Sequence, residues 1–286
     1  MTAHDKRLHA FRPDLADARL KGEVAAERFV AGRPARIVAP VADVQKEPRP
    51  DAAMNTQFLC GDDVTVFDEA EGWAWVQAER DRYVGYVSAG FLGARDGTPT
   101  HLVSVPRTFL YPGADLKLPR QAELSLGSLV AVTGFAETRG TRYAVLSSGE
   151  ALIAGHLKPV GEHAEDFVAV AETLVQTPYL WGGASGFGID CSGLVQLSMR
   201  MAGRDVLRDS DMQAETIGDP IEPGDGLSGL RRGDLVFWKG HVGIMTDDKT
   251  MIHANGHTML VSREGLQDAI GRIGYLYGGP TGFRRP

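Results

Sequence analysis

The sequence of 286 residues predicts an α+β domain at residues 161–286, preceded by two small all-β domains at residues 36–96 and 97–160. Short alternating runs separated by Gly, Asp and Ser turns fill the first half of the chain, a pattern typical of small antiparallel barrels. Beyond residue 162, helical spacing comes first and strand-like runs follow, an order that favours an α+β fold. With 43% hydrophobic and 23% charged residues, the chain can bury ordinary globular cores.

The all-β half begins with a lead-in at residues 1–35, in which a short helical stretch is expected at 15–20. Two β-rich segments follow, and their strand-like runs start near residues 61 and 127. The segments also close on similar phrases, Ser-Ala-Gly-Phe-Leu and Ala-Gly-His-Leu. This repeated pattern resembles tandem bacterial SH3-like domains.

The α+β domain has its helical spacing at residues 164–175 and again at 193–202, where apolar positions leave a wide hydrophobic face. A glycine-rich turn separates the two expected helices. After a loop rich in Pro and Gly, strand-like runs follow at 234–238, 242–245, 250–254 and 259–261.

Charge and hydropathy exclude some partners. The formal net charge is −7 and there is no long basic run, so a phosphate backbone would find little to bind, and nucleic acid is not expected. No run approaches the roughly 18 apolar residues of a membrane span. The polar N-terminus leads into no apolar signal segment, which predicts a cytoplasmic protein if residue 1 is the natural start and an exported one if a signal has been trimmed. A monomer is expected.

Cys191 is one of only two cysteines, and it lies between the glycine-rich turn and an apolar segment. Thiolate, the nucleophilic form of cysteine, is favoured at a helix N-terminus and beside an imidazole. Asp190 suits the N-cap of that helix, and a purely structural role is as plausible for it as a functional one. Cys60 is expected to be a small buried hydrophobe. The pattern indicates a thiol hydrolase.

The expected base is His241, at the entry of a strand, with a glycine on each side, Gly240 and Gly243, that allows close approach of backbone and substrate. His253 would lie on the neighbouring strand and orient His241 by a hydrogen bond. Either histidine alone is more often structural, but together with Cys191 they predict a triad. A zinc site would need more ligands than these, and the glycine-rich turn lacks the ending of a phosphate loop. No metal or cofactor is therefore expected.

Five motifs follow one another in the second half of the chain: Tyr179-x-Trp181-Gly182-Gly183, Asp190-Cys191-Ser192-Gly193-Leu194-Val195, Arg232-Gly233-Asp234-Leu235-Val236-Phe237-Trp238, His241-Val242-Gly243-Ile244 and His253-Ala254. In order and spacing they resemble the NlpC-type cell-wall cysteine peptidases. That resemblance implies a papain-like α+β fold for the catalytic domain, with Cys191 as nucleophile, His241 as base and His253 as orienting residue.

The whole chain resembles a narrower group in which two SH3-like domains precede the peptidase, the γ-D-glutamyl-L-diamino acid endopeptidases, or dipeptidyl-peptidases VI. The group implies murein peptides with a free N-terminal L-Ala as substrate, L-Ala-γ-D-Glu as product and a role in cell-wall recycling. The residues that match its amine-binding pocket are Tyr83, Trp181, Asp190, Ser192 and Ser210. For Tyr83, a barrel aromatic is an equal alternative.

The chain departs from this group at two points: Gly240 stands where a histidine can precede the base, and the acidic residue of the first SH3-like domain has only a loose candidate, Glu47. Three other functions stay open. They are an exported DL-endopeptidase that acts on intact peptidoglycan, a non-catalytic muropeptide-binding module, and a thioester-based acyltransferase or amidase on the same fold. The sequence does not distinguish meso-diaminopimelate from lysine as the diamino acid.

Overall fold

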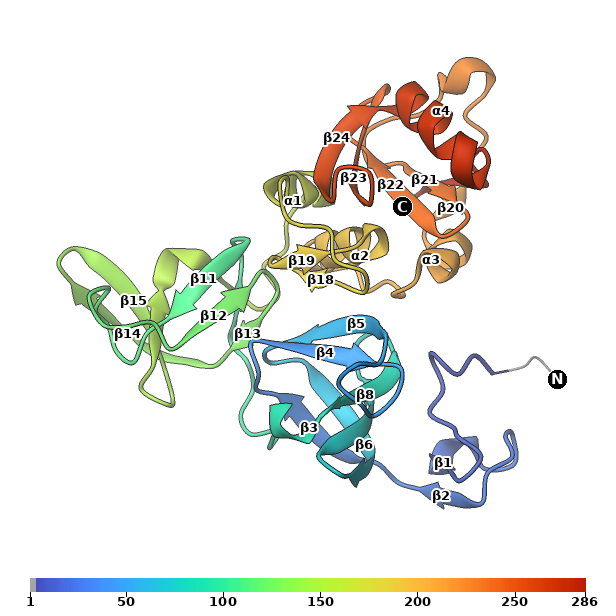
Figure 1. Cartoon of the computed structure of the whole chain (residues 1–286). Coiled ribbons are helices and arrows are strands. Elements are labelled where there is room, and N and C mark those ends of the chain that lie inside the picture. Colours follow the sequence, from blue (N-terminus) through green and yellow to red (C-terminus); the bar gives the residue numbers. More distant parts are fainter. Residues whose placement is uncertain (1–3) are drawn as a thin grey trace. The chain divides into compact units, whose positions relative to one another are not determined.

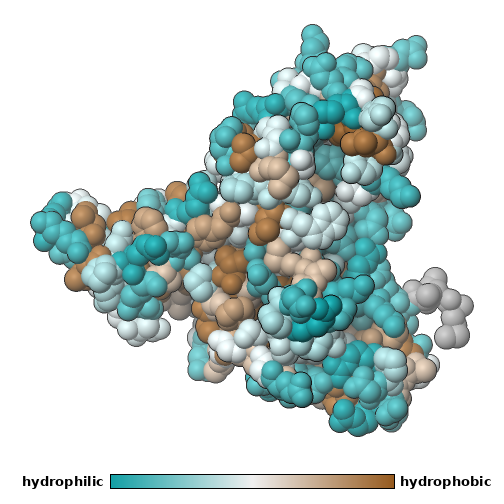
Figure 2. All heavy atoms as spheres, viewed as in Figure 1, coloured by the Kyte–Doolittle hydropathy of each residue, from teal (hydrophilic) through white to brown (hydrophobic). Residues whose placement is uncertain are grey.

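The computed structural model describes residues 4–286, and the chain forms two compact units, Met1–Glu162 and His163–Pro286. The first unit is built of strands and short 3-10 turns, and the second combines helices with a six-stranded sheet (Figure 1). In the space-filling view, the visible face is mainly hydrophilic, with apolar side chains in small groups (Figure 2). Within the described part of the chain, no helix has the length and apolar character needed to cross a membrane.

The lead-in contains less helix than expected. Only η1 (Ala18–Leu20) is helical, because β1 (Leu15–Asp17) is a strand that pairs in parallel with β2 (Arg28–Val30). Leu15 packs with Phe67 and Trp75 of the following domain, so the lead-in is part of the first unit's hydrophobic core.

The first β-rich segment forms one seven-stranded sheet in the order β5-β4-β8-β7-β6-β3-β9. Alternating small and branched residues, among them Ala35, Val44, Val64 and Val76, point into a common core. The strands are β3 (Arg33–Ile37), β4 (Val41–Gln45), β5 (Met54–Leu59), β6 (Asp63–Ala70), β7 (Trp73–Ala78), β8 (Val84–Ser88) and β9 (Leu92–Gly93).

The second β-rich segment repeats the closing turn of the first. A 3-10 turn, η2 (Ala89–Phe91), precedes β9, and η3 (Ala154–His156) precedes β17 (Leu157–Pro159) in the same way. The second segment otherwise differs, because its strands form three small sheets where the first has one. The remaining strands are β10 (His101–Val103), β11 (Arg107–Leu110), β12 (Ala122–Ser125), β13 (Leu129–Val130), β14 (Val132–Thr138), β15 (Thr141–Leu146) and β16 (Ala151–Ile153).

The second unit is the α+β domain that the sequence predicts. Its main sheet has the order β20-β25-β21-β22-β23-β24 (Figure 1). The strands are β20 (Asp219–Pro220), β21 (Leu235–Trp238), β22 (His241–Met245), β23 (Thr250–Asn255), β24 (Leu260–Gly265) and β25 (Gly282–Arg285), and a small hairpin joins β18 (Ala184–Ser185) to β19 (Gly188–Ile189).

The two expected helices are present as α1 (Phe167–Thr173) and α2 (Cys191–Met201). Sequence analysis missed two others, α3 (Ser210–Thr216) and α4 (Leu266–Tyr277), as well as strand β25. Helix α2 packs on β22 and β23, and α4 lies beside β24. The sheet and α2 therefore bring together the strands and the helix that carry the predicted triad.

Sheet register determines which side chains share a face. Met245 on β22 pairs with Met251 on β23, and side chains alternate along each strand, so His241 and His253 point to the same face. Glu264 on β24 lies opposite Met251, which makes it the diagonal neighbour of His253 on that face.

Candidate active site

Cys191 is the first residue of α2, as expected, and Asp190 is the N-cap. The Asp190 carboxylate accepts a hydrogen bond of 2.7 Å from the backbone N–H of Gly193, which satisfies one of the free donors at the helix start. The same turn requires glycine at position 193, because a Cβ there would lie 2.3 Å from the carbonyl oxygen of Gly183. The Gly182-Gly183 turn therefore packs closely against the first turn of the helix that carries Cys191.

The Cys191 side chain is buried, and burial together with the nearby Asp190 charge raises the pKa of its thiol to about 12. A backbone hydrogen bond from Val242 acts in the opposite direction. This contact places the sulfur next to the backbone of β22, one residue from His241. The half-buried phenol of Tyr179 also lies near the thiol; burial and the negative charge that Cys191 can carry raise the pKa of Tyr179 to about 12.

The two histidines are in direct contact: His241 Nε2 lies 2.8 Å from His253 Nδ1. Burial first, and then repulsion by any positive charge on the neighbouring His253 ring, lowers the pKa of His241 to about 3, so the His241 ring is neutral at ordinary pH. Burial thus favours the uncharged form of both side chains, the Cys191 thiol and the His241 imidazole.

Glu264 lies on the other side of His253. Nε2 of the fully buried His253 lies 2.7 Å from Oε1 of Glu264, although the approach is not well directed for a hydrogen bond. Glu264 is also ion-paired with Arg272 of α4. Burial would raise the pKa of Glu264, but His253 and Arg272 outweigh it and lower that pKa to about 2. Glu264 is thus a carboxylate at all ordinary pH values.

Asp190 is already paired with a buried cation. Arg208, which is 1% exposed, donates to the two carboxylate oxygens at 3.0 and 2.7 Å and to the hydroxyl of Ser192 at 2.7 Å. Gly182 donates a further backbone hydrogen bond of 2.9 Å to Asp190. The carboxylate at the start of α2 is therefore neutralised and fully hydrogen-bonded within the domain.

The other residues predicted for the amine pocket have different environments. Ser192 is buried beside Asp190, and Ser210 is the partly exposed first residue of α3. Trp181 is 70% exposed, next to the Gly182-Gly183 turn. Tyr83 is 3% exposed and packs in the core of the first β-rich segment. This is the structural role that the sequence analysis gave as the alternative to substrate binding. Its part in substrate binding stays a prediction.

Sequence analysis missed Arg208, Glu264 and Tyr179 as individual site residues. Arg208 lies in the loop before α3, two residues from Ser210, and its type and position gave no sign of burial. The side-chain amide of Gln213 supports the same region by donating a hydrogen bond of 3.0 Å to the Ser192 carbonyl. A buried arginine needs a buried acceptor, and the only clue available was the nearby Asp190. Glu264 could have been found only from the register of β23 with β24.

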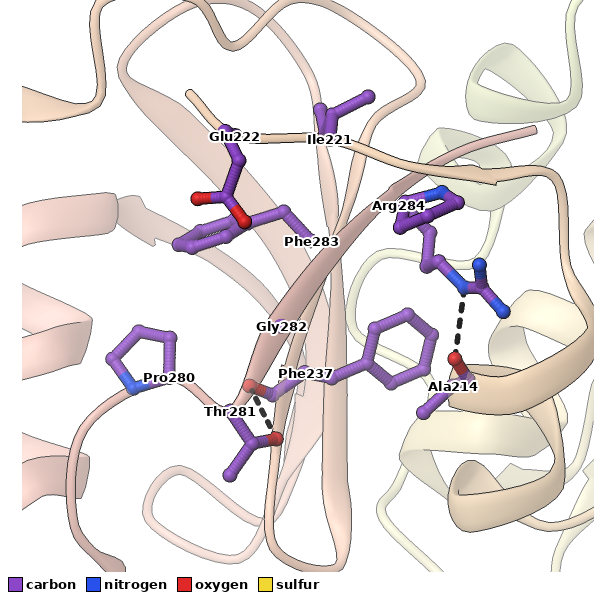
Figure 3. Close-up of a pocket in the computed structure, with 10 residues that line it drawn as sticks. Ala214, Ile221, Glu222, Phe237, Pro280, Thr281, Gly282, Phe283 and Arg284 are labelled. Atoms are coloured by element: carbon purple, nitrogen blue, oxygen red, sulfur yellow. Dashed lines mark hydrogen bonds between the residues drawn. The ribbon is translucent and has the colours of Figure 1, made fainter. Parts of the chain in front are cut away.

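A cavity of about 540 Å³ lies elsewhere in this unit, between α3 and strands β20, β21 and β25. Figure 3 shows Phe237, Phe283 and Glu222 around it, with the Arg284 guanidinium hydrogen-bonded to the Ala214 carbonyl. None of the predicted triad or pocket residues lines it. Among residues 4–286, no cluster of three His, Cys, Asp or Glu side chains could hold a metal ion.

A cysteine at the start of a helix, packed against an antiparallel sheet that carries two hydrogen-bonded histidines, is the arrangement of a papain-like cysteine peptidase. Residues 176–270 match the NlpC/P60 family, and residues 44–90 match the bacterial dipeptidyl-peptidase Sh3 domain. The chain is therefore a cysteine peptidase with an NlpC/P60 domain and an SH3 domain before it. Neither of these two matched ranges includes the second β-rich segment.

Similar proteins cover most of the chain. A dipeptidyl-peptidase 6 of Lysinibacillus sphaericus is 27% identical over 77% of this chain and 86% of its own length. A γ-D-glutamyl-L-lysine dipeptidyl-peptidase of Bacillus subtilis strain 168 is 28% identical over 71% of this chain and 73% of its own. The solved structure of an NlpC/P60 family protein from Bacillus cereus ATCC 10987 superimposes with a TM-score of 0.73, covering 88% of this chain and 99% of that one at 23% identity, a likeness of fold.

Proposed function

We propose that this peptidase hydrolyses the γ-D-glutamyl–diamino acid bond of murein peptides that have a free N-terminal L-Ala, and releases L-Ala-γ-D-Glu. The contact between His241 and His253 beside the Cys191 helix carries the chemical part of the proposal. The two relatives with dipeptidyl-peptidase names, whose alignments cover 77% and 71% of this chain, support the substrate class.

In the proposed mechanism, the Cys191 thiol gives its proton to His241 as sulfur forms a bond to the γ-carbonyl carbon of D-Glu. Backbone N–H groups at the start of α2 stabilise the oxyanion. The C–N bond then breaks, and His241 returns its proton to the leaving amine. The resulting thioester is hydrolysed by a water that loses a proton to His241, which restores the thiol when the C–S bond breaks. No cofactor enters these steps.

The free amine of L-Ala is proposed to bind near Asp190, Ser192 and Ser210. Because Arg208 already neutralises Asp190, the pocket cannot rely on one unpaired carboxylate. We infer that hydroxyl acceptors, Ser192 and Ser210, contribute much of the selectivity, with the exposed Trp181 as an apolar wall.

The proposal extends to the setting of the reaction. We propose that the protein is a monomer that acts in the cytoplasm on murein peptides already released from the wall. We also propose that the second β-rich segment is a second SH3-like domain. The shared 3-10 turn and following strand support that repeat. The preferred diamino acid would be lysine or diaminopimelate.

The test uses L-Ala-γ-D-Glu-meso-diaminopimelate, its L-lysine counterpart and the N-acetylated form of each, with products identified by mass spectrometry. We expect cleavage of the free-amine peptides only. Cleavage of acetylated and free peptides at equal rates would contradict the free-amine requirement. Cleavage of none, with Cys191 still alkylated by a thiol reagent, would instead favour an acyltransferase or a binding module.

A second candidate is an endopeptidase that acts on intact peptidoglycan. A protein of Corynebacterium glutamicum named a probable endopeptidase is 32% identical over 158 residues, 54% of this chain. Release of peptides from whole sacculi would favour this function, and failure to digest sacculi while free peptides are cut would exclude it.

A further inference from the structure

His253 is hydrogen-bonded on one side and in contact with a carboxylate on the other. Its Nδ1 lies 2.8 Å from His241 Nε2, and its Nε2 lies 2.7 Å from Glu264 Oε1. The ring itself has no exposed surface, so water does not compete for either nitrogen. The position of the ring protons must therefore be decided by these two neighbours.

The chemistry of the neighbours leaves one arrangement. A carboxylate can only accept, so the proton of neutral His253 is on Nε2, facing Glu264. Nδ1 of His253 then has no proton and must accept from Nε2–H of His241. In neutral His241 this leaves Nδ1 as the single unprotonated nitrogen, and that nitrogen is the one able to receive the Cys191 proton.

We propose that Glu264 is a positioning residue that fixes the ring protons of His253, and through His253 those of His241, so that His241 is held in its basic tautomer. This inference rests on the cysteine peptidase chemistry proposed above. Glu264 acts through His253, and its negative charge also stabilises the imidazolium that His241 becomes when Cys191 is deprotonated.

The setting of Glu264 supports this role. Glu264 is on β24, diagonal to His253 on β23, so the sheet itself holds the two side chains in line. Arg272 of α4 pairs with the same carboxylate oxygen and ties α4 to β24, but a glutamate at neutral pH is charged without it. The charged and titratable groups around the His253 ring are thus His241 from β22, Glu264 from β24 and Arg272 from α4.

The alternative is a purely structural ion pair that ties α4 to β24. Glu264→Gln and Arg272→Met both break that pair, but only Glu264→Gln removes the carboxylate from His253. If Glu264 only ties α4 to β24, the two variants should have the same effect on the site. If it positions His253, they should differ.

The first measurement is the rate of Cys191 alkylation by iodoacetamide at neutral pH, read by peptide mass spectrometry. It needs no murein substrate, so it remains informative if the proposed substrate is wrong. Cys60 in the other unit is an internal control. We expect Glu264→Gln to slow Cys191 alkylation by about ten- to a hundredfold with Cys60 unchanged, and Arg272→Met to retain most of the Cys191 rate. Equal slowing in both variants, or a wild-type rate in Glu264→Gln, would overturn the proposal.

The second measurement is the ¹⁵N spectrum of the histidine rings in the wild-type protein, which is decisive even if Glu264→Gln does not fold. The proposal requires the proton of neutral His253 on Nε2 and that of neutral His241 also on Nε2. A proton on Nδ1 of His253 contradicts it. In hydrolysis assays with a cleaved peptide, Glu264→Gln should lower kcat and leave KM nearly unchanged, because the proposed role of Glu264 acts on the base through His253.

Discussion

The carboxylate of Asp190 and the guanidinium of Arg208 form a buried ion pair with two hydrogen bonds, of 3.0 and 2.7 Å, directly before the proposed nucleophile. Arg208 is 1% exposed, and it also donates to the carbonyl of Gly183 at 3.2 Å. One side chain therefore joins the glycine turn, the helix cap and the loop that leads to α3. The pair keeps the start of α2 in a fixed position.

Removal of this arginine should be costly. Arg208→Met leaves the buried Asp190 charge without its cation, and we expect the unfolding free energy of the catalytic unit to fall by about 3–5 kcal/mol. Arg263→Met is the control in the same unit, because Arg263 is 49% exposed and pairs with Glu172 at the surface, where an ion pair contributes about 0–1 kcal/mol. Urea denaturation of both variants measures the difference. Similar losses in the two would contradict the structural role given to Arg208.

Glycine at position 193 should be indispensable for a steric reason. The Cβ of Gly193→Ala would lie 2.3 Å from the backbone oxygen of Gly183, so the start of α2 must shift and carry Cys191 with it. A displacement of about 1 Å can reduce turnover about a hundredfold. Gly271→Ala in α4 is the control, since no atom lies within 4 Å of its added Cβ, and alanine should stabilise the helix by up to about 1 kcal/mol. Peptidase assays and thermal melting of both variants test the contrast.

The neutral His241 predicts a pH-dependent loss of stability. Its folded pKa, about 3, is below the ordinary value of 6.5, so the unfolded state binds the proton more tightly. The contribution of His241 is present above pH 6.5 and is lost as pH falls toward 3. Between pH 6.5 and 5, above the titration of Glu264, we expect the opening equilibrium of β22 and β23 to rise by up to about tenfold per pH unit.

Hydrogen exchange of peptides from these two strands measures that equilibrium, after correction for the intrinsic effect of pH on exchange. The same peptides in His241→Gln should show a much weaker dependence, because glutamine does not titrate. A steep slope that survives in the variant would assign the effect to another group.

Cys191→Ala should abolish hydrolysis, by at least about three orders of magnitude, while the fold is retained. Alanine is close in volume to cysteine and suits a helix start that Asp190 already caps. Cys60→Ala is the control: burial raises the pKa of Cys60 to about 11, and this residue lies in the other unit. Substantial turnover by Cys191→Ala, measured with the peptide that the wild type cleaves, would show that Cys191 is not the nucleophile.

The parts of the site that sequence analysis predicts are those with local signals. Asp190 precedes an apolar helical pattern, and the cap and the position of Cys191 follow from that pattern alone. His241 and His253 lie on consecutive strands, so their proximity follows from antiparallel pairing. Helix α2 begins at Cys191, within two residues of the predicted start.

The parts that sequence analysis misses depend on tertiary geometry. Arg208 is a charged residue in a loop, and its burial follows only from the packing of that loop on the α2 cap. Glu264 becomes a neighbour of His253 through a register that the turn between β23 and β24 sets. Helix α4 was overlooked although its buried residues, Leu266, Ala269 and Ile273, have helical spacing, because two glycines weaken the pattern.

The position of β25 has a consequence for how the domain is made. Residues 282–285 insert between β20 and β21, so both of those strands keep an open edge until this segment has been synthesised. Cys191 and the two histidines emerge earlier in translation. An arrested or truncated chain would therefore expose two unpaired strand edges, which are sites for intermolecular pairing. We therefore expect C-terminal truncation before β25 to promote aggregation, although the residues removed are remote from the chemistry.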